Sequence, residues 1–272
     1  MTRLSAPRGT VAQGGGWDPA LYGRYASLRL RPARDLLARV PDDLPGGKIV
    51  DLGCANGAAG PAIADRFPDR KIIGVDAAPA MLAEAAATGA YHRCDLADAV
   101  DWRPGKPPAL IFANGLLQWL PDHDRLIPDL AGRLAPGGVL ALQMSRQHNA
   151  PSHRFLREFA AEMFPDRFDF TGWQPPVAAP IDYLRMLAPL GAADVWETDY
   201  LQRLPAAETG HPVRLFTEPT TMRPFLDLLA RDEAAAFLHR YEMALGAAYP
   251  AEADGSVIFP YRRMFLTLRV GG

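Results

Sequence analysis

The stretch that most constrains this chain is IVDLGCANGAAG, residues Ile49–Gly60, in which an apolar, strand-like run enters a turn of small residues. A dinucleotide fingerprint would need glycines two and five residues after Gly53, and both positions hold alanine. A triphosphate loop would end in Gly-Lys-Ser/Thr, which this turn lacks. The spacing that fits is acid-x-Gly-x-small-x-Gly, residues Asp51–Gly57. The turn therefore favours a ligand other than a dinucleotide or a triphosphate.

Strand-like and helix-like runs alternate along most of the chain. Buried strands are indicated by continuous β-branched or apolar runs, and helices by apolar residues at helical spacing with Pro or Gly at their ends. This alternation predicts an α/β fold with a doubly wound, seven-stranded, mostly parallel sheet of Rossmann-like type. The expected strands are 48–54, 71–76, 90–96, 109–115, 139–144, 193–204 and 263–270.

The pattern changes after Met144, where aromatic and Pro-rich helical segments interrupt the sheet elements. Because ligands bind outside the carboxyl ends of parallel strands, helical inserts on that side are typical of an enzyme with a lid. The predicted organisation is a flexible N-terminus (1–16), a cofactor-binding core (17–148), a helical insert (149–180), the core continued (181–204), a helical lid insert (205–262) and the last core strand (263–272).

Composition narrows the class of protein further. The chain has 272 residues, 49% of them hydrophobic, and a formal net charge of −2, so we expect a full core but no basic nucleic-acid face. No apolar run approaches the roughly 20 residues that span a bilayer, so we expect no membrane-bound protein. The first residues lack the apolar stretch of a secretory signal, so we expect none here. Its two cysteines show no disulfide or metal-ligand spacing, which favours a reduced, cytoplasmic location.

Acids follow successive predicted strands behind the glycine turn. Asp76 ends the second strand and could accept both hydroxyls of a ribose, and Asp95 lies at the end of the third. This arrangement resembles the class I S-adenosylmethionine-dependent methyltransferases, in which the first acid serves the ammonium of the methionyl group and the later acids serve ribose and adenine. The cofactor-binding residues implied by the resemblance are Asp51, Gly53, Cys54, Ala55, Gly57, Asp76, Ala77, Met81, Asp95, Leu96, Ala113 and Asn114.

A narrower resemblance covers most of the chain. The sequence is similar to the trans-aconitate 2-methyltransferase family in the segments WDPALYGRYASLRLRPARDLLARV, DLGCANG, GVDAAPAMLAEA, LIFANGLLQWLPDH, LAPGGVLALQM, MRPFLDLL and RRMF. The resemblance implies esterification of one carboxylate of a small polycarboxylic acid. The chain departs from the family where the central glycine of the turn is Ala55 and where Phe216 replaces an expected tryptophan.

Such a reaction needs alignment more than acid–base chemistry. A carboxylate is already ionised at neutral pH, so we expect no general base, no metal and no certain catalytic residue; catalysis is by proximity and exclusion of water. Arginines are expected to hold the carboxylates that do not react, since pairing the attacking one would weaken it as a nucleophile. The expected substrate-binding residues are Tyr22, Arg29, Gln118, Trp119, Arg223 and Arg263, with Tyr22, Trp119, Arg223 and Arg263 positioning the acceptor.

Other interpretations of the same residues stay open. Each arginine could equally form a surface ion pair, and His123 more often caps a helix than takes part in catalysis. The acceptor could instead be an O, N or C atom of another small biosynthetic intermediate, as the inserts and Phe216 suggest. A third hypothesis, suggested by Ala55 in the turn, is a methyltransferase-like protein that binds a nucleoside or a partner without turnover. The sequence leaves the oligomeric state open.

Overall fold

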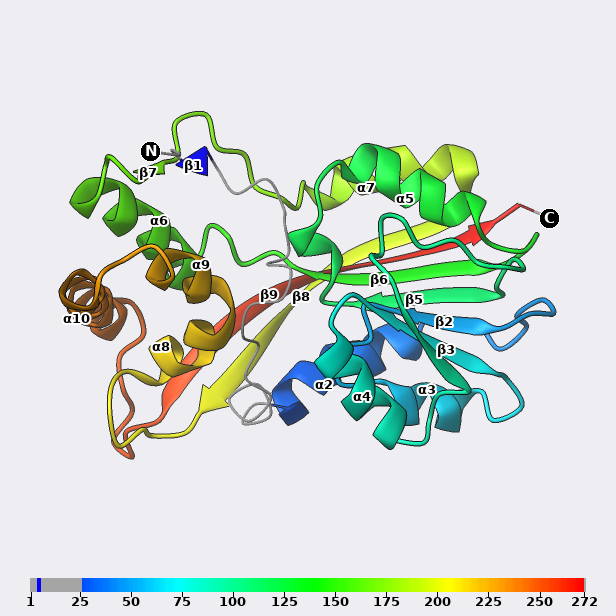
Figure 1. Ribbon diagram of the computed structural model, residues 1–272, viewed down its shortest axis with the longest axis horizontal. Coiled ribbons are helices and arrows are strands. Elements are labelled where there is room, and N and C mark those ends of the chain that lie inside the picture. The colour runs from blue at the N-terminus through cyan, green and yellow to red at the C-terminus, as the bar shows by residue number, and fades with distance from the viewer. Residues whose placement is uncertain (1–3, 6–25, 272) are drawn as a thin grey trace.

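A computed structural model describes residues 4–5 and 26–271 of the chain (Figure 1). Its centre is a seven-stranded sheet of order β4-β3-β2-β5-β6-β9-β8. β9 runs antiparallel to both neighbours, β6 and β8, and the other pairs are parallel. The strands are β2 (Ile49–Leu52), β3 (Ile72–Asp76), β4 (Arg93–Leu96), β5 (Leu110–Asn114), β6 (Val139–Ser145), β8 (Gly191–Leu204) and β9 (Val257–Val270). The predicted fold class is confirmed.

Helices cover both faces of this sheet. Alternating β2 residues point to opposite layers, so that Val50 packs with α5 residues and Ile49 packs with α2 and α3 residues. One layer thus holds α5 (His123–Gly132) and α7 (Pro180–Leu187), and the other holds α2 (Ala26–Leu37), α3 (Gly60–Arg66) and α4 (Pro79–Ala87) (Figure 1). This two-sided burial explains the continuous apolar runs of the central strands.

A helical cap lies at one end of the sheet. It comprises α6 (Pro151–Met163), α8 (Pro212–Thr217), α9 (Arg223–Leu226) and α10 (Arg231–Ala248). These helices bury a core of their own, in which Phe237, Tyr241 and Leu245 of α10 contact apolar residues from the outer ends of β8 and β9. The short elements are β1 (Leu4–Ser5), which pairs with β7 (Phe168–Asp169), and η1 (Leu117–Trp119), η2 (Ala188–Leu190) and η3 (Glu218–Met222).

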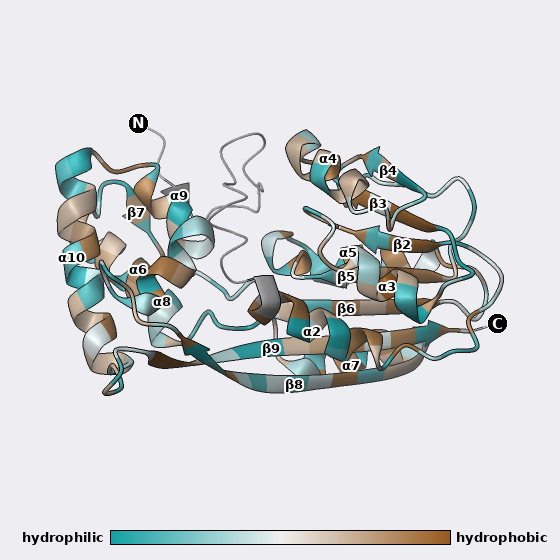
Figure 2. Cartoon of the chain, turned by 90° about the horizontal axis from the view of Figure 1, so that it is seen from below, coloured by the Kyte–Doolittle hydropathy of each residue, from teal (hydrophilic) through white to brown (hydrophobic). Residues whose placement is uncertain are grey.

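Two long strands join the cap to the sheet. β8 and β9 each span 14 residues, and they pair with one another along their whole length. β6 pairs only with the Arg263–Arg269 part of β9, so the remainder of both strands leaves the sheet as a two-stranded ribbon. Figure 2 shows this ribbon running from the sheet into the cap. The cap is therefore carried by strands that also belong to the sheet.

The last strand begins earlier than the sequence indicates. We expect a start at Arg263, but β9 begins at Val257 and contains Pro260. A proline lacks the N–H that a central strand must donate, and it is tolerated here because this part of β9 has a partner strand on one side only.

The division into core and inserts stays our interpretation. Most of the predicted N-terminal segment lies outside the described residues, and none of the helices described has the length and apolar character to cross a bilayer.

Candidate active site

The glycine turn after β2 takes a conformation that requires small residues. Gly53, Ala55 and Gly57 have φ values of 71°, 48° and 79°, all in the left-handed region. A Cβ at Gly57 would lie 2.7 Å from the Cα of Ala85, and one at Gly53 would lie 2.8 Å from a Leu116 methyl group. Ala55 holds a conformation that costs a non-glycine residue about 1–2 kcal/mol. Surrounding contacts must therefore hold the turn in place.

Asp76 provides such contacts. Its Oδ2 accepts a hydrogen bond from the Ala55 N–H at 2.9 Å, and its Oδ1 accepts one from the Ala78 N–H, also at 2.9 Å. The carboxylate at the end of β3 thus ties the turn to the start of α4. Each oxygen keeps a further lone pair, which is what binding of two ribose hydroxyls would use.

Asp51 lies beneath the turn rather than at its surface. The residue is only 2% exposed, and its Oδ2 accepts a hydrogen bond of 2.6 Å from the Tyr91 hydroxyl. Burial, with a smaller contribution from the nearby Asp76, raises the pKa of Asp51 to about 7, although the Tyr91 hydrogen bond acts in the opposite direction. The sequence anticipated the acid but not its tyrosine partner.

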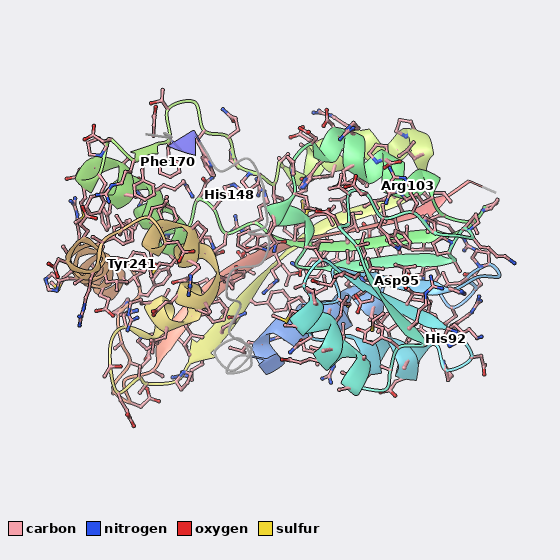
Figure 3. The ribbon with its side chains drawn as sticks, viewed as in Figure 1. His92, Asp95, Arg103, His148, Phe170 and Tyr241 are labelled. Carbon is pink, nitrogen blue, oxygen red and sulfur yellow. The ribbon has the colours of Figure 1, made fainter. Side chains whose placement is uncertain are left out.

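Asp95 and Leu96 lie at the next strand tip, on β4 (Figure 3 labels Asp95). Both carboxylate oxygens of Asp95 bind Arg93, with Arg93 Nε 2.7 Å from Oδ1 and Nη2 2.9 Å from Oδ2, and this pairing raises the pKa of Arg93. Leu96 is 62% exposed, an unusual position for a large apolar side chain at a strand end. An exposed apolar side chain beside a carboxylate is chemically suited to an adenine ring, the role that the family resemblance implies for this strand end.

The carboxyl ends of β5 and β6, with the neighbouring middle part of β9, bring polar side chains together. The register pairs Asn114 with Gln143 and Ser145 with Arg263. Arg263 is buried, donates from Nη1 to Gln143 Oε1 at 3.1 Å, and lies over the ring of Tyr261 at 4.8 Å. A buried guanidinium at the carboxyl edge of a parallel sheet is a suitable group for a carboxylate ligand.

One buried atom at this edge supports the methyl-donor assignment. Within the described part of the chain, Asn114 Oδ1 is buried and accepts no hydrogen bond. Buried acceptors are rarely left without a donor, and Asn114 is the residue expected at the methionine end of the donor. Together with the Asp76 carboxylate and the exposed Leu96, this acceptor makes the edge a chemically suitable site for S-adenosylmethionine.

The remaining predicted cofactor residues follow the same edge. Cys54 and Met81 are buried, Ala113 is buried at the end of β5, and Ala77 is exposed beyond Asp76. Burial raises the pKa of the Cys54 thiol, so this cysteine packs as an apolar group. These residues support the edge of the site rather than adding charge to it.

The predicted substrate residues are divided between this edge and other places. Gln118 and Trp119 lie on η1, which follows β5 in the sequence. Gln118 Nε2 donates a hydrogen bond of 2.5 Å to the Gly115 carbonyl oxygen. Arg223 begins α9 in the cap, is exposed, and pairs with Asp227 at 2.7 Å. Tyr22 and the side chain of Arg29 lie outside the described part of the structure.

His123 occupies a structural position. It is buried at the first residue of α5, with Nδ1 2.5 Å from the Tyr183 hydroxyl and Nε2 2.7 Å from the Leu117 carbonyl oxygen. Burial lowers its pKa. His123 begins α5 but does not cap it, because Asp122 is the N-cap residue and both His123 ring nitrogens bind groups outside the helix.

A separate hollow of about 330 Å³ lies away from this edge, between the connection that follows β4 and helix α5. Arg103 (labelled in Figure 3) and Asp129 approach to 3.5 Å at its wall. None of the residues predicted to bind cofactor or substrate lines this hollow.

Sequence reasoning missed Tyr91, Gln143 and Tyr261. Gln143 carried a usable signal, because it is a polar residue inside the apolar run VLALQM of a buried strand. Tyr91 and Tyr261 carried none, since their contacts join segments that are distant in the sequence.

Comparison with known families agrees with this geometry. A family model described as a methyltransferase domain matches residues 22–187, more than half of the chain. Fold and family together define the class: a class I, S-adenosylmethionine-dependent methyltransferase.

More specific relatives narrow the class. Trans-aconitate 2-methyltransferase of Methylobacterium radiotolerans is 42% identical over 261 residues, covering 93% of this chain and 98% of the relative. The enzyme of the same name from Streptomyces avermitilis is 44% identical over 260 residues, covering 92% and 95%. The chain belongs to the trans-aconitate 2-methyltransferase family.

Solved structures share the fold at low sequence identity. The YcgJ protein of Bacillus subtilis has a TM-score of 0.56 at 13% identity, covering 89% of this chain and 100% of that one. A phosphoethanolamine N-methyltransferase of Haemonchus contortus, solved with S-adenosyl-L-methionine, has a TM-score of 0.50 at 16% identity, covering 88% of this chain and 52% of that one.

Proposed function

We propose that this enzyme transfers the methyl group of S-adenosylmethionine to a carboxylate oxygen of trans-aconitate. The observation that carries the acceptor assignment is the 40–44% identity to relatives of that name over almost the whole chain. A buried arginine at the carboxyl edge of the sheet, where an anionic acceptor would lie, supports it.

The donor would lie along the edge formed by β2, β3, β4 and β5. Asp76 would accept the ribose hydroxyls, Leu96 and Asp95 would flank the adenine, and Asn114 would face the methionine end. S-adenosylmethionine supplies a methyl group that is already activated as a sulfonium. The protein's part is therefore to align and enclose the reactants.

The acceptor residues follow from the charge of the substrate. Arg263 would hold a carboxylate that does not react, with Gln143 fixing its guanidinium. Gln118 and Trp119 would shape the cavity, and Tyr22, Arg29 and Arg223 complete the proposed set. A carboxylate is ionised at neutral pH, so the attacking oxygen needs no base. Exclusion of water strengthens these contacts between charged groups, because water can then no longer compete for the same hydrogen bonds.

We also propose a cytoplasmic location for the enzyme. Both cysteines, Cys54 and Cys94, are free, and a reducing compartment keeps such thiols reduced.

The test is methyl transfer from S-adenosylmethionine labelled in its methyl group to trans-aconitate, with cis-aconitate, citrate and a long-chain monocarboxylic acid as comparisons. We expect a labelled product from trans-aconitate that loses its label in mild base, as an ester does. A base-stable product would exclude a carboxyl ester and favour a different acceptor atom. Absence of both transfer and binding of S-adenosylhomocysteine would favour a non-catalytic protein.

A further inference from the structure

Three glycines leave a slot beside the turn, and one side chain fills it. A Cβ at Gly60 would lie 2.7 Å from Tyr91 Cε2, and one at Gly57 or Gly74 would lie 3.0 Å from the same ring. These glycines come from the turn, from the first residue of α3 and from β3. The Tyr91 ring therefore contacts three separate segments that surround the donor turn.

The hydroxyl of this ring reaches the buried acid at the same place. Gly74 on β3 is paired with Asp51 on β2. The Tyr91 ring, which covers Gly74, therefore lies beside Asp51. The Tyr91 hydroxyl donates to Asp51 Oδ2 at 2.6 Å, within an apolar layer. Other titratable groups near Asp51 are Asp76, Cys54 and Cys94.

We propose that Tyr91 is a positioning residue of the donor site, which holds the Asp51 carboxyl and the glycine turn in the conformation that receives S-adenosylmethionine. The inference rests on the proposed function, because it assumes that the donor binds above this turn. Tyr91 acts through Asp51 and the turn and does not itself contact the reacting atoms.

The proposal predicts a pH dependence of donor binding. Burial raises the pKa of Asp51 to about 7, so the ionised fraction of this carboxyl increases as the pH is raised through neutrality. Its negative charge would stabilise the positively charged donor, so affinity should rise as the pH is raised through this range. Since the Tyr91 bond lowers this pKa, removal of the hydroxyl should move the midpoint of the rise to higher pH.

The experiment measures S-adenosylmethionine binding by calorimetry from pH 6 to pH 8.5, without acceptor, for the wild type and Tyr91→Phe. We expect the midpoint to move upward by about half a unit to one unit, which makes the variant about two- to fivefold weaker at pH 7, where about half of the wild-type carboxyl is ionised. Ionisation of the ligand is common to both curves and cancels in the comparison. A purely structural loss would weaken binding equally across the pH range.

The chain offers a matched control. Tyr200 donates from its hydroxyl to Asp35 at 2.6 Å, the same distance as in the Tyr91 pair, but it lies on β8 at the opposite edge of the sheet from β4. Tyr200→Phe should leave both the midpoint and the affinity unchanged. A shift in this control equal to that of Tyr91→Phe would overturn the proposal.

A second variant approaches the slot from the other side. Gly60→Ala retains Tyr91 but places a methyl group where the ring lies, and Gly60 has no positive φ that would strain the alanine. We expect it to displace the hydroxyl from Asp51 and to reproduce the Tyr91→Phe shift, which keeps the proposal testable if one variant fails to fold. If the wild type binds the donor but neither variant moves the midpoint, the role of Tyr91 is refuted and the proposed function stands. If the wild type does not bind the donor, the proposed function fails first.

Discussion

Replacement of Asp76 by alanine tests the donor assignment most directly. The carboxylate accepts two backbone hydrogen bonds of 2.9 Å, from Ala55 and Ala78, and keeps free lone pairs directed at the edge of the sheet. Asp76→Ala therefore removes both the proposed ribose acceptor and the two bonds that hold the turn.

The magnitude follows from the kind of bond that is lost. Hydrogen bonds to a charged acceptor contribute roughly 1.5–3 kcal/mol each, and Asp76 is partly exposed, so water replaces some of this contribution. We expect S-adenosylhomocysteine to bind about 1.5–3 kcal/mol more weakly, which is roughly 10- to 150-fold. We expect the free energy of unfolding to fall by only about 1–2 kcal/mol.

Calorimetric titration measures the affinity, and denaturant unfolding measures the stability. Asp98→Ala is the matched control, because Asp98 also accepts a backbone N–H after a strand, from Val100 at 2.9 Å, but is not part of the proposed donor site. Affinity of the folded Asp76→Ala variant within twofold of the wild type would refute the placement of the ribose.

Three further predictions concern other parts of the molecule. Ala55→Gly should stabilise the protein by about 0.5–1 kcal/mol in denaturant unfolding, because alanine is strained at φ 48°; lower stability would contradict the strain. Arg263→Lys retains the charge but loses the planar fork, so KM for trans-aconitate should rise about tenfold while S-adenosylhomocysteine affinity is unchanged; equal loss of both would place Arg263 outside the acceptor site. Burial lowers the pKa of His153 from 6.5 to about 3, so the unfolded chain takes up a proton that the folded protein excludes, and stability falls as the pH drops below about 6.5. Between pH 7 and pH 5 the free energy of unfolding should fall by about 2 kcal/mol less in His153→Gln than in the wild type. An equal fall in both proteins would show that His153 is not the cause.

Much of the fold could be predicted because the sheet is buried on both faces. Residues such as Ile49, Val50, Ile72 and Ile73 form apolar runs that only a central parallel strand explains, and each lies in β2 or β3. The start of β9 could not be predicted, since Pro260 argues against a strand unless one knows that this part of the ribbon has one partner.

The candidate site was predictable only in part. The positions of Asp76 and Asp95 follow from the rule that parallel strands end at one edge, and both lie at strand tips. The burial of Asp51 and its bond to Tyr91 depend on a contact across 40 residues of sequence, which no local pattern encodes. The roles of the named site residues stay predictions until they are tested by binding and turnover.

The strand β9 also constrains how the protein can be made. Its residues complete three separate hydrophobic clusters, with Met264 in one sheet layer, Phe265 in the other and Phe259 in the cap. During synthesis on the ribosome, the hydrophobic cores of the sheet and of the cap therefore stay incomplete until β9 has been added. Until then, the nascent chain would expose both unfinished cores, and a truncation within this strand should abolish folding as a whole.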